Sequence, residues 1–303
     1  MSASEAAIPA RVGGAGPIAA YLVLCFVWGS TYLAIRLAVA GIPPTIMVGT
    51  RSVLAGLVLT GFAFARGARL PPARVLVTTA ATGFMLFVGG QTMLALAETR
   101  IQSGQAAVVG AMQALVMPLA AWALGAASAP GWAAVMALLV GFGGVVILVN
   151  PGHTSIDPIG VAAVLASVVS WSVGGAMARR WPSGNVVLGS GLQMLIGGLA
   201  ALALSVPVGA WHGFSWSTVP ARALAGFAYL ASVGSLVGFS AFAWLVQIWP
   251  PARLATYTYV NPIVALLLGA MIAGEALTAR DLAATAVILS AVGLVMAAAR
   301  NKA

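Results

Sequence analysis

The sequence predicts an all-α membrane protein with ten transmembrane helices, arranged as two inverted five-helix repeats. Hydrophobic residues make up 61% of the 303 residues and charged residues only 6%, and the mean hydropathy is +1.05. A soluble domain carries roughly 25% charged residues. A chain this poor in charge is suited to lipid, where helices or a closed barrel satisfy every backbone hydrogen bond. The alternation over about 10 residues that marks barrel strands is absent, so the sequence favours helices.

Apolar runs of about 20 residues match helices that cross a hydrocarbon core of roughly 30 Å. Pro, Gly or Arg interrupts the chain in nearly every gap between these runs. The five runs expected in the first half are Pro17–Ala38, Pro43–Ala65, Val75–Ala97, Ser103–Leu124 and Gly131–Val149. The five expected in the second half are Pro158–Ala178, Asn185–Val206, Ala221–Val246, Ala252–Ala273 and Leu282–Ala299.

An internal repeat divides the chain into two domains. Trp28 and Arg36 in the first run recur as Trp171 and Arg179 in the sixth, at a shift of 143 residues. The predicted repeats cover residues 17–149 and 158–299, and a polar hinge over 150–158 joins them. Five spans is an odd number, so the second repeat enters the membrane upside down relative to the first. Inverted repeats of this kind are common in secondary transporters, where the halves rock about a site near the midplane.

The distribution of Lys and Arg predicts that both termini lie in the cytoplasm. With that orientation the inner side carries Arg11, Arg66, Arg69, Arg74, Arg179, Arg180, Arg253, Arg300 and Lys302, which is nine, and the outer side carries Arg36, Arg100, Arg222 and Arg280, which is four. The net charge of +9 is spread over loops without a basic stripe. Membrane topology therefore explains the charge, and no nucleic-acid partner is expected.

Few side chains are available for metal binding or catalysis. The single cysteine, Cys25, excludes an internal disulfide and a multi-cysteine metal site, and His153 and His212 fall in separate connections. No catalytic residue, metal or cofactor is predicted. Residues 1–16 lack the order of a signal peptide and are expected to form a short lead. The Ala- and Gly-rich composition is typical of a bacterial protein, so the predicted location is the bacterial cytoplasmic (inner) membrane.

Several short motifs resemble the drug/metabolite transporter superfamily in its ten-helix EamA-type branch. They are Trp28-Gly29 in the first run, Arg51 in the second, and Asn261-Pro262 followed by Gly274-Glu275 in the ninth. The resemblance covers about residues 17–299 and implies a secondary transporter similar to bacterial exporters of amino acids, including aromatic ones. The chain departs from the family pattern in the fourth run, where Gln113 and Ala126 replace a Pro and a Glu.

Aromatic and polar side chains within the spans are the candidates for a substrate cavity. Trp28 and Trp171 each lie about eleven residues into a span, too deep for the interfacial aromatic belt; ordinary packing is the alternative. Amides and hydroxyls in hydrocarbon need a partner helix or a wet cavity, so a helix–helix hydrogen bond is the alternative for them. The predicted cavity residues are Trp28, Thr31, Tyr32, Gln91, Gln113, Ser170, Trp171, Tyr257, Tyr259 and Asn261.

Four further residues are predicted to gate the pathway or form an ion pair. Arg51 lies about nine residues into the second span and needs a partner or water. Glu98 and Glu275, at the outer ends of spans, are the expected partners; a static pair or simple snorkelling is the alternative. Pro262 frees a backbone carbonyl at midspan, where a gating kink and a static kink are both open.

These features predict export of small metabolites, most simply amino acids, by alternating access through a central cavity. No Asp, Glu or Lys lies at mid-span, so transport is expected to be uncoupled or weakly coupled. The alternative is export of cationic drugs or other metabolites by proton antiport. An intramembrane enzyme and a non-transporting scaffold are remote alternatives. The expected partners are a small-molecule solute and the lipid bilayer, and the expected state is a monomer.

Overall fold

The computed structural model describes residues 14–129, 131–149 and 156–300, and the regular elements in these ranges are all helical. The first half contains α1 (Ala15–Val39), α2 (Pro44–Ala65), α3 (Ala73–Gly83), the π-helix η1 (Phe84–Thr92), α4 (Met93–Ala97), α5 (Ser103–Gly110), α6 (Gln113–Ala123) and α7 (Trp132–Val149). The second half contains α8 (Pro158–Arg180), α9 (Val186–Ser205), η2 (Trp216–Thr218), α10 (Ala221–Tyr229), the π-helix η3 (Leu230–Gly238), α11 (Phe239–Ile248), α12 (Pro251–Leu254), α13 (Tyr257–Leu268), the π-helix η4 (Gly269–Ala273) and α14 (Ala279–Arg300).

Helices cover all ten predicted ranges, which confirms the all-α fold class. Within the described residues, six helices are long and apolar enough to cross a membrane, and α5 with α6 makes a seventh if this pair, bent by 41°, is one span. The number of ten crossings and their orientation stay predictions. Most of the predicted hinge, including His153, lies outside the described residues, as do Arg11, Lys302 and residues 1–13 of the expected lead.

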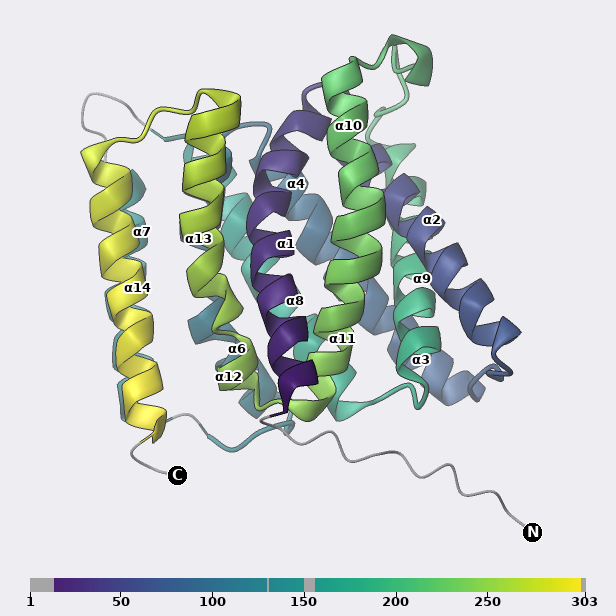
Figure 1. Ribbon diagram of the computed structural model, residues 1–303, viewed down its shortest axis with the longest axis horizontal. Helices are drawn as coiled ribbons and strands as arrows, with labels where there is room; N and C mark the ends of the chain where they lie inside the picture. The colour runs from purple at the N-terminus through teal and green to yellow at the C-terminus, as the bar shows by residue number, and fades with distance from the viewer. Residues whose placement is uncertain (1–13, 130, 150–155, 301–303) are drawn as a thin grey trace.

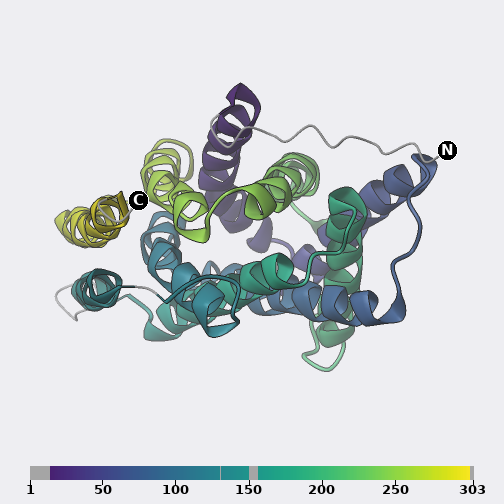
Figure 2. The ribbon, with the colours of Figure 1, turned by 90° about the horizontal axis from the view of Figure 1, so that it is seen from below.

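The first helix of each half is embedded in the opposite half. α1 packs against α10, η3, α11 and α13, whereas α8 packs against η1, α4, α5 and α6. Figure 1 shows α1 and α8 in the middle of the bundle, with α2 and α9 on one side and α7 and α14 on the other. Seen along the bundle in Figure 2, the paired α7 and α14 form one edge. Because α1 and α8 each pack into the opposite half, the repeated Trp28 and Trp171 both lie at the centre of the protein.

α2 and α9 cross in backbone contact because glycine removes side chains from both helices. A methyl group at Gly56 would lie 2.6 Å from the amide nitrogen of Leu195, and one at Gly198 would lie 2.8 Å from the amide nitrogen of Val53. Small residues of this kind allow close helix association in membranes, where hydrophobic burial contributes little. The crossing joins the two halves of the chain beside the central cavity.

Large apolar side chains cover the outside of the bundle. Among the most exposed are Phe26, Leu57, Val77, Trp132 and Met271, with exposed fractions of 64%, 54%, 68%, 73% and 80%. Soluble monomers rarely expose so many apolar groups together. Lipid contact explains this surface, as expected for a membrane protein.

Two π-helical stretches occupy corresponding positions of the two halves. η1 and η3 are both nine residues long and are related by a shift of 146 residues. π-helical turns are rare and often mark functional sites. Each stretch lies inside a longer helix, Ala73–Ala97 and Ala221–Ile248 respectively, and each faces the centre of the bundle.

Candidate functional site: a central cavity between the halves

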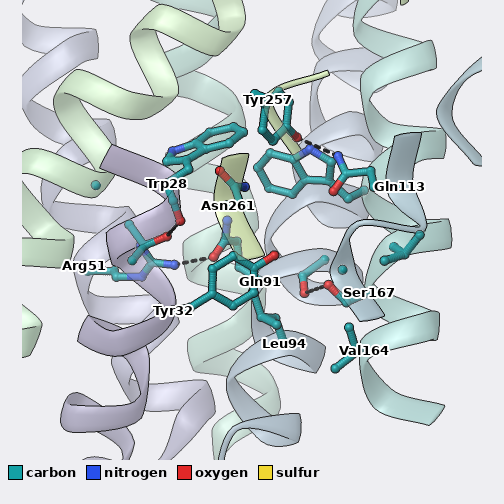
Figure 3. Close-up of a pocket in the computed structure, with 16 residues that line it drawn as sticks. Trp28, Tyr32, Arg51, Gln91, Leu94, Gln113, Val164, Ser167, Tyr257 and Asn261 are labelled. Atoms are coloured by element: carbon teal, nitrogen blue, oxygen red, sulfur yellow. Dashed lines mark hydrogen bonds between the residues drawn. The ribbon is translucent and has the colours of Figure 1, made fainter. Parts of the chain in front are cut away.

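A small central cavity lies where the two halves meet, with a volume of about 60 Å³. Figure 3 shows side chains from α1, α2, η1, α8 and α13 pointing into it. Its lining comprises Trp28, Thr31, Tyr32, Arg51, Gly90, Gln91, Leu94, Gly110, Gln113, Val164, Ser167, Val168, Trp171, Gly234, Tyr257 and Asn261.

Aromatic rings form one wall of the cavity. The rings of Trp28 and Trp171 are perpendicular, with centroids 5.3 Å apart. Phe242 lies 5.0 Å from Trp28 and 5.4 Å from Trp171, and Tyr257 lies 5.1 Å from Trp28. Edge-to-face and tilted contacts at these separations are favourable. The rings of this wall therefore stabilise one another by packing, and they present faces and edges to a solute.

A buried hydrogen bond joins two broken helices across the cavity. Gln113 follows the break between α5 and α6, and Tyr257 follows the break between α12 and α13. The amide Nε2 of Gln113 donates to the Tyr257 hydroxyl at 2.7 Å (Figure 3). Discontinuous helices frequently form the substrate sites of transporters, and here one from each half meets the other.

Arg51 connects the π-helices η1 and η3. Its Nη2 donates to Gln91 Oε1 in η1 at 2.6 Å, and its Nη1 donates to Ser235 Oγ in η3 at 3.3 Å. Arg51 is only 4% exposed, so a charge is held in the interior. Neither Glu98 nor Glu275 pairs with it in this structure. The expected ion pair is replaced by hydrogen bonds to neutral groups because α2 faces the π-helices at this level.

Three buried polar atoms of the cavity lining have no hydrogen-bond partner among the described residues. They are the donors Nε of Arg51 and Nε1 of Trp171, and the acceptor Oδ1 of Asn261. Buried polar atoms are nearly always hydrogen-bonded, and the exceptions require an explanation. Donors and an acceptor on residues that line one cavity are complementary to a polar solute or to water.

Eight of the ten predicted cavity residues line the cavity, and Ser170 and Tyr259 do not. Residues four apart share a helix face. Ser167 therefore lies beside Trp171 and donates to the Gly90 carbonyl, whereas Ser170 donates to the Met85 carbonyl outside the cavity.

Tyr259 is excluded for the same reason. Asn261 shares a face with Tyr257, whereas Tyr259 is about 200° around the helix from Tyr257. The four-residue spacing between Ser167 and Trp171 would have identified Ser167 as a lining residue. No sequence pattern identifies the lining glycines Gly90, Gly110 and Gly234.

The predicted gating residues lie at and beyond the cavity. Glu275 accepts hydrogen bonds from Ser103 N at 3.0 Å, Ser103 Oγ at 2.8 Å and Gly104 N at 3.2 Å. It therefore caps the N-terminus of α5 from the opposite half. Glu98 is fully buried, and neither carboxyl oxygen has a hydrogen-bond partner in the described part of the chain. Pro262 is buried within α13, and the interruption of this span lies earlier, between Leu254 and Tyr257.

Among the described residues, no group of three or more His, Cys, Asp and Glu side chains could hold a metal ion. The cavity lining combines aromatic rings, amides, hydroxyls and one guanidinium group. Such a lining can bind and orient a small amphipathic molecule between the two halves.

Comparisons with known proteins agree with this architecture. The EamA-like transporter family matches residues 16–150 and 158–297. The inner membrane transporter YedA of Escherichia coli K12 is 33% identical over 281 residues, covering 91% of this chain and 89% of YedA. Protein PecM of Dickeya dadantii is 29% identical over 279 residues, covering 89% of this chain and 88% of PecM.

A crystal structure of a protein that is 18% identical aligns with a TM-score of 0.69, covering 94% of this chain and 99% of that one, so the fold is shared. The family match extends over nearly the whole chain, and the apolar helices fit a multi-pass protein of the inner membrane. The chain therefore belongs to the EamA-like transporter family of the drug/metabolite transporter superfamily.

Proposed function

We propose that the chain exports amino acids, aromatic ones foremost, by alternating access through the central cavity. The two five-helix repeats rock against each other and expose the cavity to each side of the inner membrane in turn. The transported solute moves down its own gradient, without obligatory proton coupling. One ten-helix chain forms the transport unit.

The observation that carries the proposal is the pairing of an aromatic wall with the unpartnered polar atoms of Arg51 and Asn261. Nε of Arg51 can donate to a carboxylate, and Oδ1 of Asn261 can accept from an ammonium group. The Trp28 and Trp171 rings offer aromatic edges and faces to an apolar side chain. Together these groups match the three parts of an aromatic amino acid.

The charge of Arg51 also argues against the alternative solutes. A flat cation would gain from ring faces but would be repelled by the guanidinium group. No carboxylate of a described residue lines the cavity, so this lining offers no acidic group for proton exchange. These two features favour an uncoupled carrier of zwitterions over a proton antiporter of cationic drugs.

The present conformation is closed around the cavity. A volume of about 60 Å³ is well below the roughly 300–1,000 Å³ of ligand pockets. Solute binding therefore requires the halves to separate. The breaks near Gln113 and Tyr257 and the two π-helices are the places where a small helix movement would open it.

Uptake of labelled phenylalanine and threonine into proteoliposomes, with and without an imposed pH gradient, tests the proposal. The expected result is saturable phenylalanine flux that the pH gradient leaves unchanged and that Arg51→Gln abolishes. Flux that requires the gradient would contradict the uncoupled mechanism. Absence of flux for both amino acids would contradict the assigned solute class.

A further inference from the structure

A second, larger cavity lies at the end of the bundle where α1 ends, which the charge distribution predicts to be the outer side. This outer cavity has a volume of about 240 Å³. Three arginines line it: Arg36 from α1, Arg100 after α4 and Arg280 from α14. The buried side chains Ile101 and Ile156 provide an apolar patch beside them.

Two aspartates line the same cavity, but protein donors already occupy their oxygens. Asp157 accepts from Arg100 Nη1 at 2.9 Å and from the backbone of Ile159 at 2.8 Å. Asp281 accepts from Thr278 N at 2.9 Å and from Gln105 Nε2 at 3.3 Å. The hydrogen bond from Arg100 lowers the pKa of the Asp157 carboxyl. Both carboxylates therefore serve as caps and partners and offer little to a cationic ligand.

Arg36 and Arg100 retain donor capacity. A guanidinium group carries five N–H donors. Arg100 uses Nη1 on Asp157, and Arg36 uses Nη1 on the backbone carbonyl of Glu98. With Arg280, three positive charges face two engaged carboxylates, which leaves an excess of positive charge. An anion is the ligand that this balance favours, and guanidinium groups bind carboxylates with paired hydrogen bonds.

The outer cavity is one helical turn from the central cavity. Tyr32 lines the central cavity and Arg36 lines the outer one, and residues four apart lie about 6 Å apart along one face of a helix. Arg36 also contacts Glu98, and Glu98 interacts electrostatically with Tyr32. A solute that leaves the central cavity on this side would meet the arginines next.

We infer that the outer cavity is a binding site for the carboxylate group of a small organic acid, with Ile101 and Ile156 contacting the apolar part. The arginines are the carboxylate ligands. One part of the inference rests on the proposed function, namely that the bound carboxylate belongs to the exported solute. Binding itself is a property of the cavity and does not depend on transport.

Calorimetric titration of the full chain in phosphatidylcholine nanodiscs tests the site, with benzoate as the probe. Benzoate should bind the wild type, and its affinity should fall by about tenfold or more, the effect of losing one to two charged hydrogen bonds, in the Arg100→Gln/Arg280→Gln variant. Arg222→Gln is the matched control, because Arg222 donates to the Ile272 carbonyl and lines neither cavity. Arg100→Lys/Arg280→Lys keeps both charges and should retain most of the affinity.

Three results would overturn the inference. These are no benzoate binding to the wild type, loss of binding in Arg51→Gln with retention in the double Gln variant, and displacement of benzoate by equimolar inorganic phosphate or benzamide. Either of the first two results would mean that benzoate does not bind in the outer cavity. The third result would mean that the outer cavity is not selective for an organic carboxylate. Benzoate binding of the expected pattern without phenylalanine flux would retain this site and reject the proposed function; flux without benzoate binding would do the reverse.

Discussion

The indole rings of Trp28 and Trp171 meet edge to face at the centre of the protein, with ring centroids 5.3 Å apart and an interplanar angle of 82°. They come from α1 and α8, each of which is packed into the opposite half. Both rings are buried, yet both line the central cavity. Any movement that separates the halves must therefore change this contact.

Removing one indole should impair transport more than a loss of volume alone would explain. Trp171→Phe keeps an aromatic ring but shortens it, so we expect a several-fold loss of phenylalanine flux in a folded protein. Trp171→Ala should abolish flux and also destabilise the protein by about 3–5 kcal/mol. Flux into proteoliposomes and thermal unfolding in detergent measure the two effects.

Trp132→Ala is the control for the Trp171 variants. Trp132 is 73% exposed on α7, away from the cavity lining. Its removal should leave flux and stability close to those of the wild type. Normal flux in Trp171→Ala would contradict a cavity role for the indole.

Arg51 should be replaceable by neither lysine nor alanine. A lysine ammonium keeps the charge but lacks the planar fork that reaches both Gln91 and Ser235. Arg51→Ala leaves Gln91 without the donor it has at 2.6 Å, and an unsatisfied buried group costs about 1–3 kcal/mol. We expect flux to fall by at least about tenfold in Arg51→Lys, and to vanish in Arg51→Ala.

Exposed Arg66 is the matched control for Arg51. It lies over the Phe62 ring, 5.7 Å from the centroid, so Arg66→Ala should leave flux unchanged. If Arg51→Ala inserts, folds and transports normally, Arg51 is a structural residue only.

The buried carboxyl of Glu98 should make the free energy of unfolding decrease as the pH rises. Glu98 directly follows the spanning segment Ala73–Ala97. Burial, and then the charge of Glu275, raises the pKa of its carboxyl well above the usual value, while Arg36 opposes the shift. The folded protein therefore holds a proton that the unfolded chain releases above a pH of about 4.3. The stability from this group is complete below that pH and is lost as the pH rises toward the folded pKa.

Unfolding temperatures of the wild type and Glu98→Gln at several pH values check this slope. The glutamine is neutral and of similar size, so the variant should be less sensitive to pH between about 5 and 8. Asp157→Asn is the control, because the hydrogen bond with Arg100 lowers the pKa of Asp157. Its contribution changes only below a pH of about 3.9, so this variant should keep the wild-type slope between about 5 and 8. Identical pH profiles for wild type and Glu98→Gln would show that Glu98 is ionised in the folded state.

The extent of the helices and most of the cavity could be predicted from the sequence. The apolar runs end at Pro, Gly or Arg, and the repeated Trp28 and Trp171 indicated a shared central position. Polar residues such as Gln113 and Asn261 had to face a partner or a cavity because lipid offers none. Hydrophobicity and spacing are enough for these features.

Side-chain directions within the spans were less predictable. Proximity in the chain does not distinguish Ser170 from Ser167 or Tyr259 from Tyr257, although only Ser167 and Tyr257 line the cavity. The partners of Arg51 depend on the π-helices η1 and η3, which shift the register of the helix faces. No residue pattern in these stretches announces a π-helix, so Gln91 and Ser235 could not be identified as its partners.

Glu275 should hold the outer end of the bundle closed. Its carboxylate caps α5 across the two halves, whereas the N-cap residue of α12, Pro250, makes no side-chain cap hydrogen bond. Ala126 occupies the position of the first half that corresponds to Glu275 at a shift of 149 residues, which agrees with this asymmetry. Hydrogen bonds to a charged group contribute about 1.5–3 kcal/mol, so Glu275→Gln should open the outer end more often.

Cysteine labelling can detect this opening. In a Cys25→Ser background, Leu94→Cys places a thiol in the lining of the central cavity. Glu275→Gln should raise its labelling rate with a membrane-impermeant maleimide by about tenfold from the outer side, because loss of the charged cap makes the closed state less stable. Asp157→Asn, which alters a carboxylate of the outer cavity without touching the contact to α5, should leave the rate unchanged. Equal labelling in all three proteins would mean that other contacts, such as the helix packing of α5 against α13, keep the outer end closed without Glu275.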